Sequence, residues 1–219
     1  MSEIKRKSIS RLALILLLFS IVVVSLVSIM FLDFRAVTSE TKIDSQVITD
    51  RFTITPSDTK IDSQVGIASN KAEIDLTGEL YFFVEEDDGL SEVLKSRLEE
   101  TLHENGIQIY EIEKLENKYD GKVLMVAILK QDVSYNPFFP SANLNVLFSY
   151  SSNGNTSYFE AQKRGDSPVF IIEHSELFIE GQQQLTDNTR GIISLRAYQN
   201  HLADEVAKDI LLKLRSGHK

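Results

Sequence analysis

One continuous apolar segment near the N-terminus constrains this chain more than any other feature. Residues 12–32, LALILLLFSIVVVSLVSIMFL, contain no charged side chain. A helix rises about 1.5 Å per residue, so a segment of this length extends for roughly 30 Å, the thickness of the hydrocarbon core of a bilayer. The sequence therefore predicts a single-pass transmembrane helix at 12–32, with the lipid bilayer as its partner.

The charges on either side of this segment predict its orientation. Four basic side chains lie within residues 1–11, whereas the residues after the segment carry charges of both signs. Because positive charge is retained on the cytoplasmic side, residues 1–11 are expected to be a cytoplasmic tail and the C-terminal part to lie outside the cell membrane. A cleaved signal peptide is the alternative, but its apolar region is normally about 7–15 residues long. An uncleaved signal-anchor is therefore favoured.

Composition limits the chemistry that the rest of the chain can perform. The chain has no cysteine, which excludes disulfides, thiolate metal sites and a catalytic cysteine. Residues 36–219 hold 18 Lys and Arg against 30 Asp and Glu, a net charge near −12. A domain this acidic repels nucleic acid, so no nucleic-acid partner is expected. The glycine patterns of P-loops, dinucleotide sites and serine hydrolases do not occur, and no cofactor or catalytic residue is predicted.

A polar stretch at 33–70 follows the apolar segment. It contains the sequence TKIDSQV twice, at 41–47 and at 59–65, with Pro56 between the two copies. Two copies are too few for a solenoid, which needs about three or more repeats. We interpret 33–70 as an extracytoplasmic stalk that a local duplication has lengthened.

The repeat is also compatible with a β-strand. In an extended chain, Thr41, Ile43, Ser45 and Val47 share one side, and the second copy has the same parity because both copies begin at an odd-numbered position. The β-branched content favours a strand over a helix. If the copies are strands of a sheet, deleting one of them should unfold the domain, and the predicted boundary near residue 71 would be wrong.

Residues 71–215 have the apolar density of a folded domain, followed by a tail at 216–219. Leucines at helical spacing predict a helix that Asn105 and Gly106 end, and a second apolar stripe predicts a C-terminal helix. Asn153-Gly154 is a favoured hairpin turn, and residues 181–191 are read as a polar connector. The expected elements are strands at 73–84, 107–112, 123–129, 144–150, 157–162 and 169–180, and helices at 90–104 and 194–214.

This order predicts a two-layer α+β domain with a mostly antiparallel sheet and two helices packed on one face. In topology alone it resembles the envelope accessory domains found among outer-membrane assembly and transport-auxiliary lipoproteins. Those proteins carry a lipid-bearing cysteine, which this chain lacks. The resemblance implies a binding or accessory role within an envelope assembly.

The densest acidic cluster is Glu85-Glu86-Asp87-Asp88, between a predicted strand and a predicted helix. Carboxylate oxygens in this number are ligands for a divalent cation, which makes the four residues candidate metal ligands. Acidic residues at a helix start also cap its free amides and complement its dipole. We favour the capping interpretation.

Two further segments are candidate sites. Tyr135, Phe138 and Phe139 lie in the two-proline loop NPFFPSA, where exposed aromatic side chains would anchor a protein partner. These side chains are also suited to fold back over the edge of the sheet. Asn155 begins the tripeptide Asn-Thr-Ser, which fits a glycosylation acceptor at the predicted hairpin tip.

The function expected from these features is that of a membrane-anchored, extracytoplasmic binding or accessory domain without catalysis. The alternative is an ectoenzyme, hydrolytic or metal-dependent, whose site combines scattered carboxylates with His174 or His201. No histidine pair has metal-ligand spacing in the sequence.

Overall fold

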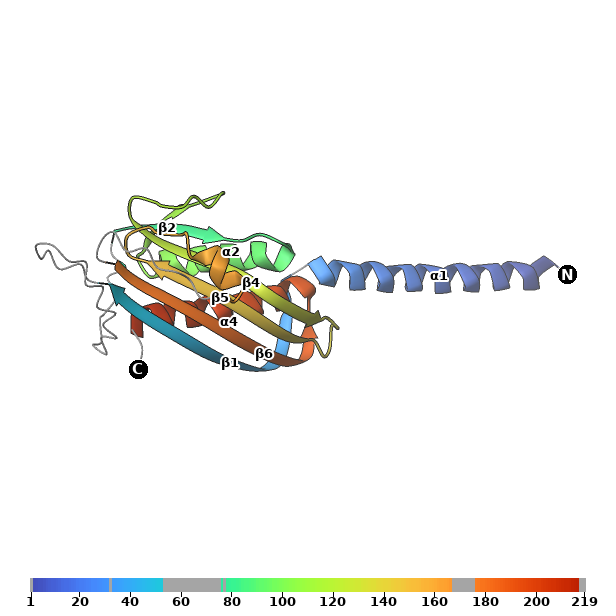
Figure 1. The fold of residues 1–219 in the computed structure, drawn as a ribbon. Coiled ribbons are helices and arrows are strands. Elements are labelled where there is room, and N and C mark those ends of the chain that lie inside the picture. Colours follow the sequence, from blue (N-terminus) through green and yellow to red (C-terminus); the bar gives the residue numbers. More distant parts are fainter. Residues whose placement is uncertain (1, 32, 53–75, 77, 167–175, 217–219) are drawn as a thin grey trace, which may run out of the picture.

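The computed structural model describes residues 2–31, 33–52, 76, 78–166 and 176–216. These residues form one α+β fold with four helices and a mixed six-stranded sheet (Figure 1). The elements in chain order are α1 (Ser2–Phe31), β1 (Arg35–Phe52), β2 (Glu79–Val84), α2 (Gly89–Glu104), β3 (Gln108–Glu111), β4 (Lys122–Ser134), β5 (Ser141–Ser151), α3 (Phe159–Lys163), β6 (Glu176–Ile193) and α4 (Leu195–Ser216).

The strand order is β1-β6-β5-β4-β2-β3, with β1 and β3 at the two edges. The ladders from β1 to β4 are antiparallel, and those joining β4 to β2 and β2 to β3 are parallel. Helix α2 makes the crossover between the parallel strands β2 and β3. The expected α+β class is confirmed, and the sheet is mixed.

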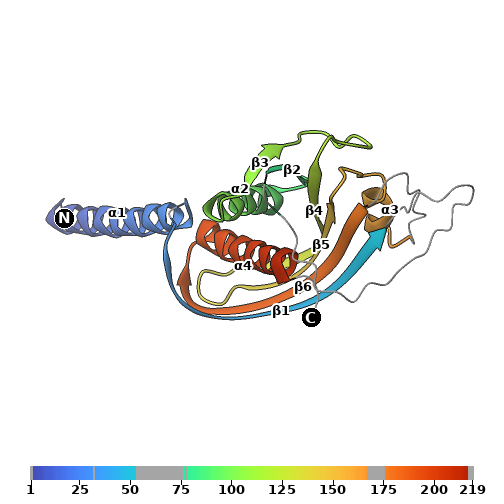
Figure 2. The same ribbon diagram turned by 90° about the vertical axis from the view of Figure 1, so that its left-hand side faces the viewer.

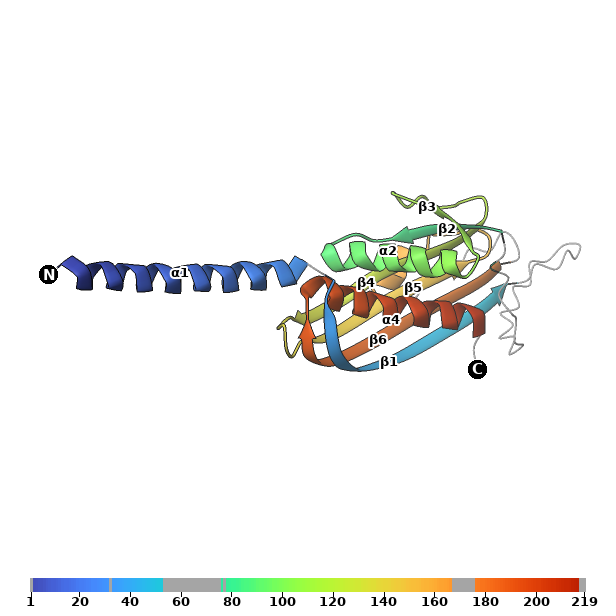
Figure 3. The ribbon, with the colours of Figure 1, turned by 180° about the vertical axis from the view of Figure 1, so that it is seen from behind.

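The main core lies between the sheet and the helix pair α2 and α4, around which the sheet curves (Figures 2 and 3). Both helices present the apolar stripes that the sequence predicts, including the fully buried Leu98, Leu102 and Leu202. Burying one such side chain contributes about 1.5–3 kcal/mol relative to leaving it exposed. A smaller core on the opposite, outer face forms where Phe159 of α3 packs with Met125 and Leu147.

One predicted strand is a helix in the structure. Residues 159–162 of the return strand expected at 157–162 belong to α3, because burial of Phe159 in the outer core outweighs the hairpin signal. Gly154 at the preceding turn has φ +82, and an added Cβ would lie 2.0 Å from the carbonyl oxygen of Tyr119. The turn is therefore closed against the neighbouring loop and does not begin a hairpin.

Helix α1 projects from the sheet domain (Figure 1). In the part of the chain that the structure describes, no helix is long and apolar enough to cross a membrane. The finding contradicts the predicted transmembrane helix at 12–32 and the single-pass anchor, and both are withdrawn.

The predicted stalk differs most from the structure. Strand β1 pairs with β6 over its whole length, from Arg35 opposite Ile193 to Phe52 opposite Glu176. The first TKIDSQV copy is therefore a sheet strand, and the sheet domain begins at residue 35 and not at 71. The second copy, at 59–65, lies outside the described residues.

Strand β6 also departs from the prediction, because the expected polar connector at 181–191 is the body of this strand. Residues 181–190 alternate strictly between buried and exposed, with Gln183, Asp187 and Thr189 on the buried side. An apolar pattern cannot reveal a strand whose buried face is polar. The structural reason for this polar face is a network of hydrogen bonds between the sheet and α4.

Candidate functional site

Asp187 of β6 carries a fully buried carboxylate, which contacts side chains of β1 and α4. Its Oδ1 accepts a hydrogen bond of 2.7 Å from the hydroxyl of Thr41 and lies 3.2 Å from Nε2 of His201. Its Oδ2 accepts from the hydroxyls of Thr189 at 2.9 Å and Tyr198 at 3.0 Å. Four side chains from three elements thus satisfy one buried charge.

Burial and hydrogen bonding oppose each other at this carboxylate. Burial is the largest single effect and raises the pKa of Asp187. The hydrogen bonds from His201, Thr41, Thr189 and Tyr198 together lower the pKa by more than burial raises it, so the pKa lies below its ordinary value. Burial and the negative charge of Asp187 raise the pKa of Tyr198 far above the usual range of a phenol. The network therefore holds an ionised acid and a neutral tyrosine in the interior.

A second polar cluster continues along the same face of β1. Asp209 of α4 accepts hydrogen bonds from the Ser45 hydroxyl at 2.5 Å and from Nε2 of the buried Gln183 at 2.7 Å. The hydroxyls of Ser39 and Thr189 share a hydrogen bond of 2.8 Å. Every hydroxyl on the inner face of β1 between 39 and 45 therefore bonds to β6 or α4.

The Asp187 network contains the residue types of a hydrolase triad but not its geometry. In a triad the acid binds one nitrogen of the imidazole and the nucleophilic hydroxyl binds the other. Here Thr41 and Asp187 both lie against Nε2 of His201, at 3.1 and 3.2 Å, and the Thr41 hydroxyl donates to the acid. His201 and Asp187 are also buried. This arrangement holds strands to a helix and does not activate a nucleophile.

The aromatic loop, residues 135–140, connects β4 to β5 and lies along the end of β6. Its carbonyl groups at Pro137, Phe138 and Pro140 each accept a backbone hydrogen bond of 3.0 Å from β6. The Tyr135 hydroxyl donates to the carbonyl of Ile193 at 2.9 Å, and partial burial raises the pKa of Tyr135. The backbone of the loop is thus anchored at three points, and its first side chain adds a fourth.

The three predicted interaction residues separate into two kinds on this loop. Tyr135 is half-buried against the main core, so its ring folds back over the sheet. Phe138 is 50% exposed and Phe139 is 68% exposed. Phe139 lines a depression of about 610 Å³ with Pro140, Ser141 and residues of β1 and β6, which include Thr38, Glu40, Asn188 and Arg190. Only the exposed residues, Phe138 and Phe139, are available to a partner.

The acidic cluster at 85–88 has partners within the chain. Asp88 caps α2 by accepting hydrogen bonds of 2.9 Å from the amides of Leu90 and Ser91, and Ser91 completes a capping box. Glu85 forms an ion pair with Lys163, and Glu86 forms one with Lys95. The capping interpretation is confirmed for Asp88. Within the described residues, no group of three or more His, Asp and Glu side chains is placed to hold a metal ion.

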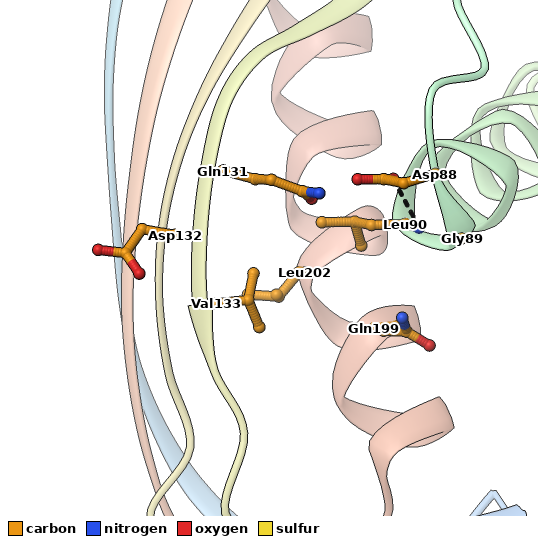
Figure 4. A pocket seen from close by; sticks show the side chains of 8 residues that line it. All are labelled: Asp88, Gly89, Leu90, Gln131, Asp132, Val133, Gln199 and Leu202. Carbon is orange, nitrogen blue, oxygen red and sulfur yellow. Dashed lines mark hydrogen bonds between the residues drawn. The ribbon is translucent and has the colours of Figure 1, made fainter.

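A second depression, of about 450 Å³, lies between the start of α2, the end of β4 and α4 (Figure 4). Leu90, Val133 and Leu202 form its apolar side, and Gln131 points across it toward Asp88. Asp132 points away, to the outer face of the sheet. The Asp88 carboxylate accepts hydrogen bonds from the first amides of α2, so it is not free to bind a ligand in the depression.

The remaining candidates lie apart from these features. Asn155 is half-buried, and its Oδ1 accepts hydrogen bonds from the amide and hydroxyl of Ser157 at 3.1 and 2.7 Å. Glycosylation there stays a prediction. His103 lies in the last turn of α2, where a positive charge suits the helix dipole. His174 and His218 lie outside the described residues.

Sequence reasoning identifies the aromatic loop but misses the buried network. Thr41, Gln183 and Asp187 fall in the predicted stalk and connector because polar residues rarely form the inner face of a sheet. The available signal is the alternation of Thr41, Ile43, Ser45 and Val47. This side of β1 is the buried or half-buried one.

Comparisons with known proteins give little further guidance. No protein-family model matches the chain, and no curated protein is significantly similar to it. The chain matches two solved structures of PelC dodecamers from Paraburkholderia phytofirmans, one of them a variant, each with a TM-score of 0.37. The variant is 9% identical and the match covers 80% of this chain and 100% of that one; for the other the values are 13%, 67% and 96%. Similarity this weak carries no argument about function.

Proposed function

We propose that this chain is a non-catalytic binding or accessory domain that contacts a protein partner through the aromatic loop and the adjoining depression. The observation that carries the proposal is the exposure of Phe138 and Phe139 on a loop whose backbone is hydrogen-bonded to β6. Two large apolar side chains held in this way lose little conformational freedom when a partner covers them. Buried aromatic anchors of this type provide much of the binding energy in protein interfaces.

The surroundings of the loop add polar specificity to this contact surface. Glu40 and Arg190 line the depression with opposite charges, and Asn188 offers an amide. An apolar centre with a polar rim is the usual composition of a protein interface. The matching partner therefore has an apolar pocket bordered by charged groups.

Catalysis, the alternative function, is favoured by no observation among the described residues. The one carboxylate–histidine pair that they contain in the interior, Asp187 with His201, belongs to the network that joins β1 and β6 to α4. Neither of the two depressions described above is lined by either residue. The extracytoplasmic location and the envelope assembly stay predictions.

Photocrosslinking in the native cell tests the proposed contact surface. A photoreactive phenylalanine analogue replaces Phe139 in the full chain, and the matched control carries it in place of Leu212. Leu212 is an apolar side chain of similar exposure, 60% against 68%, on α4. We expect a discrete crosslinked product from position 139 that is absent from position 212.

A second variant separates the loop from general effects on the fold. Phe138→Ala should reduce the yield from position 139 severalfold, while the melting temperature stays unchanged because the side chain is exposed. The same product from both positions, or no product from position 139, would contradict the proposed function.

A further inference from the structure

The turn that follows β5 brings an asparagine side chain close to the backbone of the next residue. Asn153 precedes Gly154 in this turn. The Oδ1 of Asn153 accepts a hydrogen bond of 3.1 Å from the backbone amide of Asn155, two residues further along the chain. This is an Asx-turn, in which the side chain is folded toward the residues that follow it. The side-chain carbon Cγ of Asn153 is therefore on the same side as the Gly154 amide, with which it can close a cyclic imide.

Two hydrogen-bond donors converge on the same side-chain oxygen. The hydroxyl of the buried Ser151 also donates to Oδ1 of Asn153, at 3.1 Å. When a nitrogen attacks Cγ, negative charge develops on Oδ1. Donors that are already in place lower the cost of this charge, as they do in the oxyanion hole of an enzyme. The backbone amide of Asn155 and the Ser151 hydroxyl are two such donors.

The attacking and leaving groups are not engaged elsewhere. Among the residues that the structure describes, the backbone amide of Gly154 and the Nδ2 of Asn153 have no hydrogen-bond partner. A glycine has no Cβ to obstruct the approach of its nitrogen. The Gly154 carbonyl accepts a bond of 2.9 Å from the amide of Tyr119, which holds the turn in one arrangement. Reacting groups held together in this way need little further ordering.

We propose that Asn153 is a site of self-modification, at which the chain converts its own asparagine to aspartate and isoaspartate. The Gly154 nitrogen bonds to Cγ of Asn153 and loses its proton to water. The bond from Cγ to Nδ2 breaks, and the Nδ2 group takes up a proton from water and leaves as ammonia. The product is a cyclic succinimide. One water molecule then opens the ring at either of its carbonyl groups, which gives aspartate or isoaspartate.

The chain contains a second Asn-Gly pair, Asn105-Gly106, which lacks these features. The Nδ2 of Asn105 donates to the carbonyl of Thr101 at 2.7 Å, so the side chain is turned back along α2. The amide of Gly106 donates to the carbonyl of His103 at 2.9 Å. Both reacting groups are therefore engaged. We expect the fold to favour reaction at the half-buried Asn153 over the exposed Asn105.

Formation of isoaspartate should separate the turn from the neighbouring loop, residues 116–121. In isoaspartate the main chain runs through the side-chain carbons, which lengthens the chain just before Gly154. The loop leaves no room for this shift, because a Cβ on Gly154 would lie 2.0 Å from the carbonyl oxygen of Tyr119 and 2.6 Å from that of Gly121. The bond from the Tyr119 amide to Gly154 should then break. Tyr119 packs against the outer core, so the modification loosens this face of the sheet.

Peptide mapping by mass spectrometry tests the self-modification in the purified full chain. The native chain is incubated at neutral pH, and deamidation at Asn153 and Asn105 is followed in the same sample. We expect reaction at Asn153 to be at least about tenfold faster than at Asn105 in the folded chain. In concentrated urea neither turn persists, and the two Asn-Gly pairs should react at similar rates. An isoaspartyl methyltransferase identifies the isoaspartate product.

Two serine variants of the same turn test the role of the donors. Ser151→Ala removes one donor to Oδ1 of Asn153 and should slow the reaction there severalfold. The matched control is Ser157→Ala, because the Ser157 hydroxyl bonds to Asn155 and not to Asn153. Its rate should equal that of the native chain. A circular dichroism spectrum checks that both variants fold, and the comparison of Asn153 with Asn105 in the native chain needs neither variant.

Three results would overturn the self-modification. One is a reaction at Asn153 that is no faster than at Asn105 in the folded chain. Another is a ratio of the two rates that is the same with and without urea, because the fold would then have no part in the reaction. The third is an unchanged rate in a folded Ser151→Ala variant, which would remove the second donor from the account.

Discussion

Asp187 determines how the polar face of this sheet is held together. Removing a carboxylate from water is costly, and this carboxylate recovers the cost through hydrogen bonds from three hydroxyls and a histidine. Neutralising the carboxylate would weaken the hydrogen bonds that it accepts from these partners. The residue is therefore a structural centre whose protonation should affect stability.

The first prediction concerns the pH dependence of stability. The folded-state pKa of Asp187 lies below its unfolded value, so its ionisation stabilises the fold above about pH 4 and this contribution is lost as the pH falls through the folded pKa. Asp187→Asn should lower the free energy of unfolding by about 2 kcal/mol at pH 7. The difference from the native chain should shrink near pH 3. Urea unfolding at both pH values measures it.

Asp44 offers a matched control for this prediction. It lies on the exposed face of β1, the strand that pairs with β6, so Asp44→Asn removes an equal charge without touching the network. Its effect should stay within about 0.5 kcal/mol at both pH values. A difference between the Asp187→Asn variant and the native chain that is unchanged at pH 3 would show that ionisation of Asp187 is not what stabilises the network.

The second prediction concerns close packing at one glycine. A Cβ added to Gly181 of β6 would lie 2.0 Å from the ring of Phe148, which is fully buried and has no space to move. Gly181→Ala should destabilise the fold by about 1–3 kcal/mol, measured by chemical denaturation. Gly89→Ala is the control, because a Cβ there meets open space. Equal midpoints for the two variants would contradict the packing at Phe148.

At the level of elements, the sequence predicts those whose buried face is apolar. Helices α2 and α4 and strands β4 and β5 carry continuous apolar faces, and they form close to where the pattern indicates. Strands β1 and β6 escape prediction because their buried faces alternate apolar and polar side chains. The partners that satisfy these polar groups lie far away in the chain, as Thr41 and Asp187 do. Only the folded structure brings them together.

The sequence also predicts only part of the candidate site. The two-proline loop with its aromatic residues is visible in the sequence, but the exposure of Phe139 and the burial of Tyr135 are not. The depression beside Phe139 also needs Thr38 and Glu40 of β1, a strand that lies within the predicted stalk.

The third prediction concerns the boundary of the domain. A chain that begins at residue 71 lacks β1, which leaves Asp187 without Thr41 and the core without Val47. It should not unfold cooperatively on heating, whereas a chain that begins at residue 33 lacks only α1 and should do so. Thermal denaturation followed by circular dichroism compares the two. A cooperative transition in both chains would show that β1 is dispensable.

The whole molecule combines a curved sheet with the two helices α2 and α4 on its concave side (Figure 2). The depression beside the aromatic loop is lined by exposed residues of β1 and β6. The proposed function depends on the pairing of β1 with β6, because residues of both strands line the depression.

Hydrogen exchange of the backbone amides at 39–47 tests this pairing most directly. Because β1 pairs with one neighbour only, every second amide bonds to β6 and the others face solvent. We predict alternating protection along 39–47, with the bonded amides exchanging at least about a hundredfold more slowly than in an unstructured peptide. Exchange of all these amides at unstructured rates, with β4 and β5 still protected, would contradict the pairing and the proposed function that rests on it.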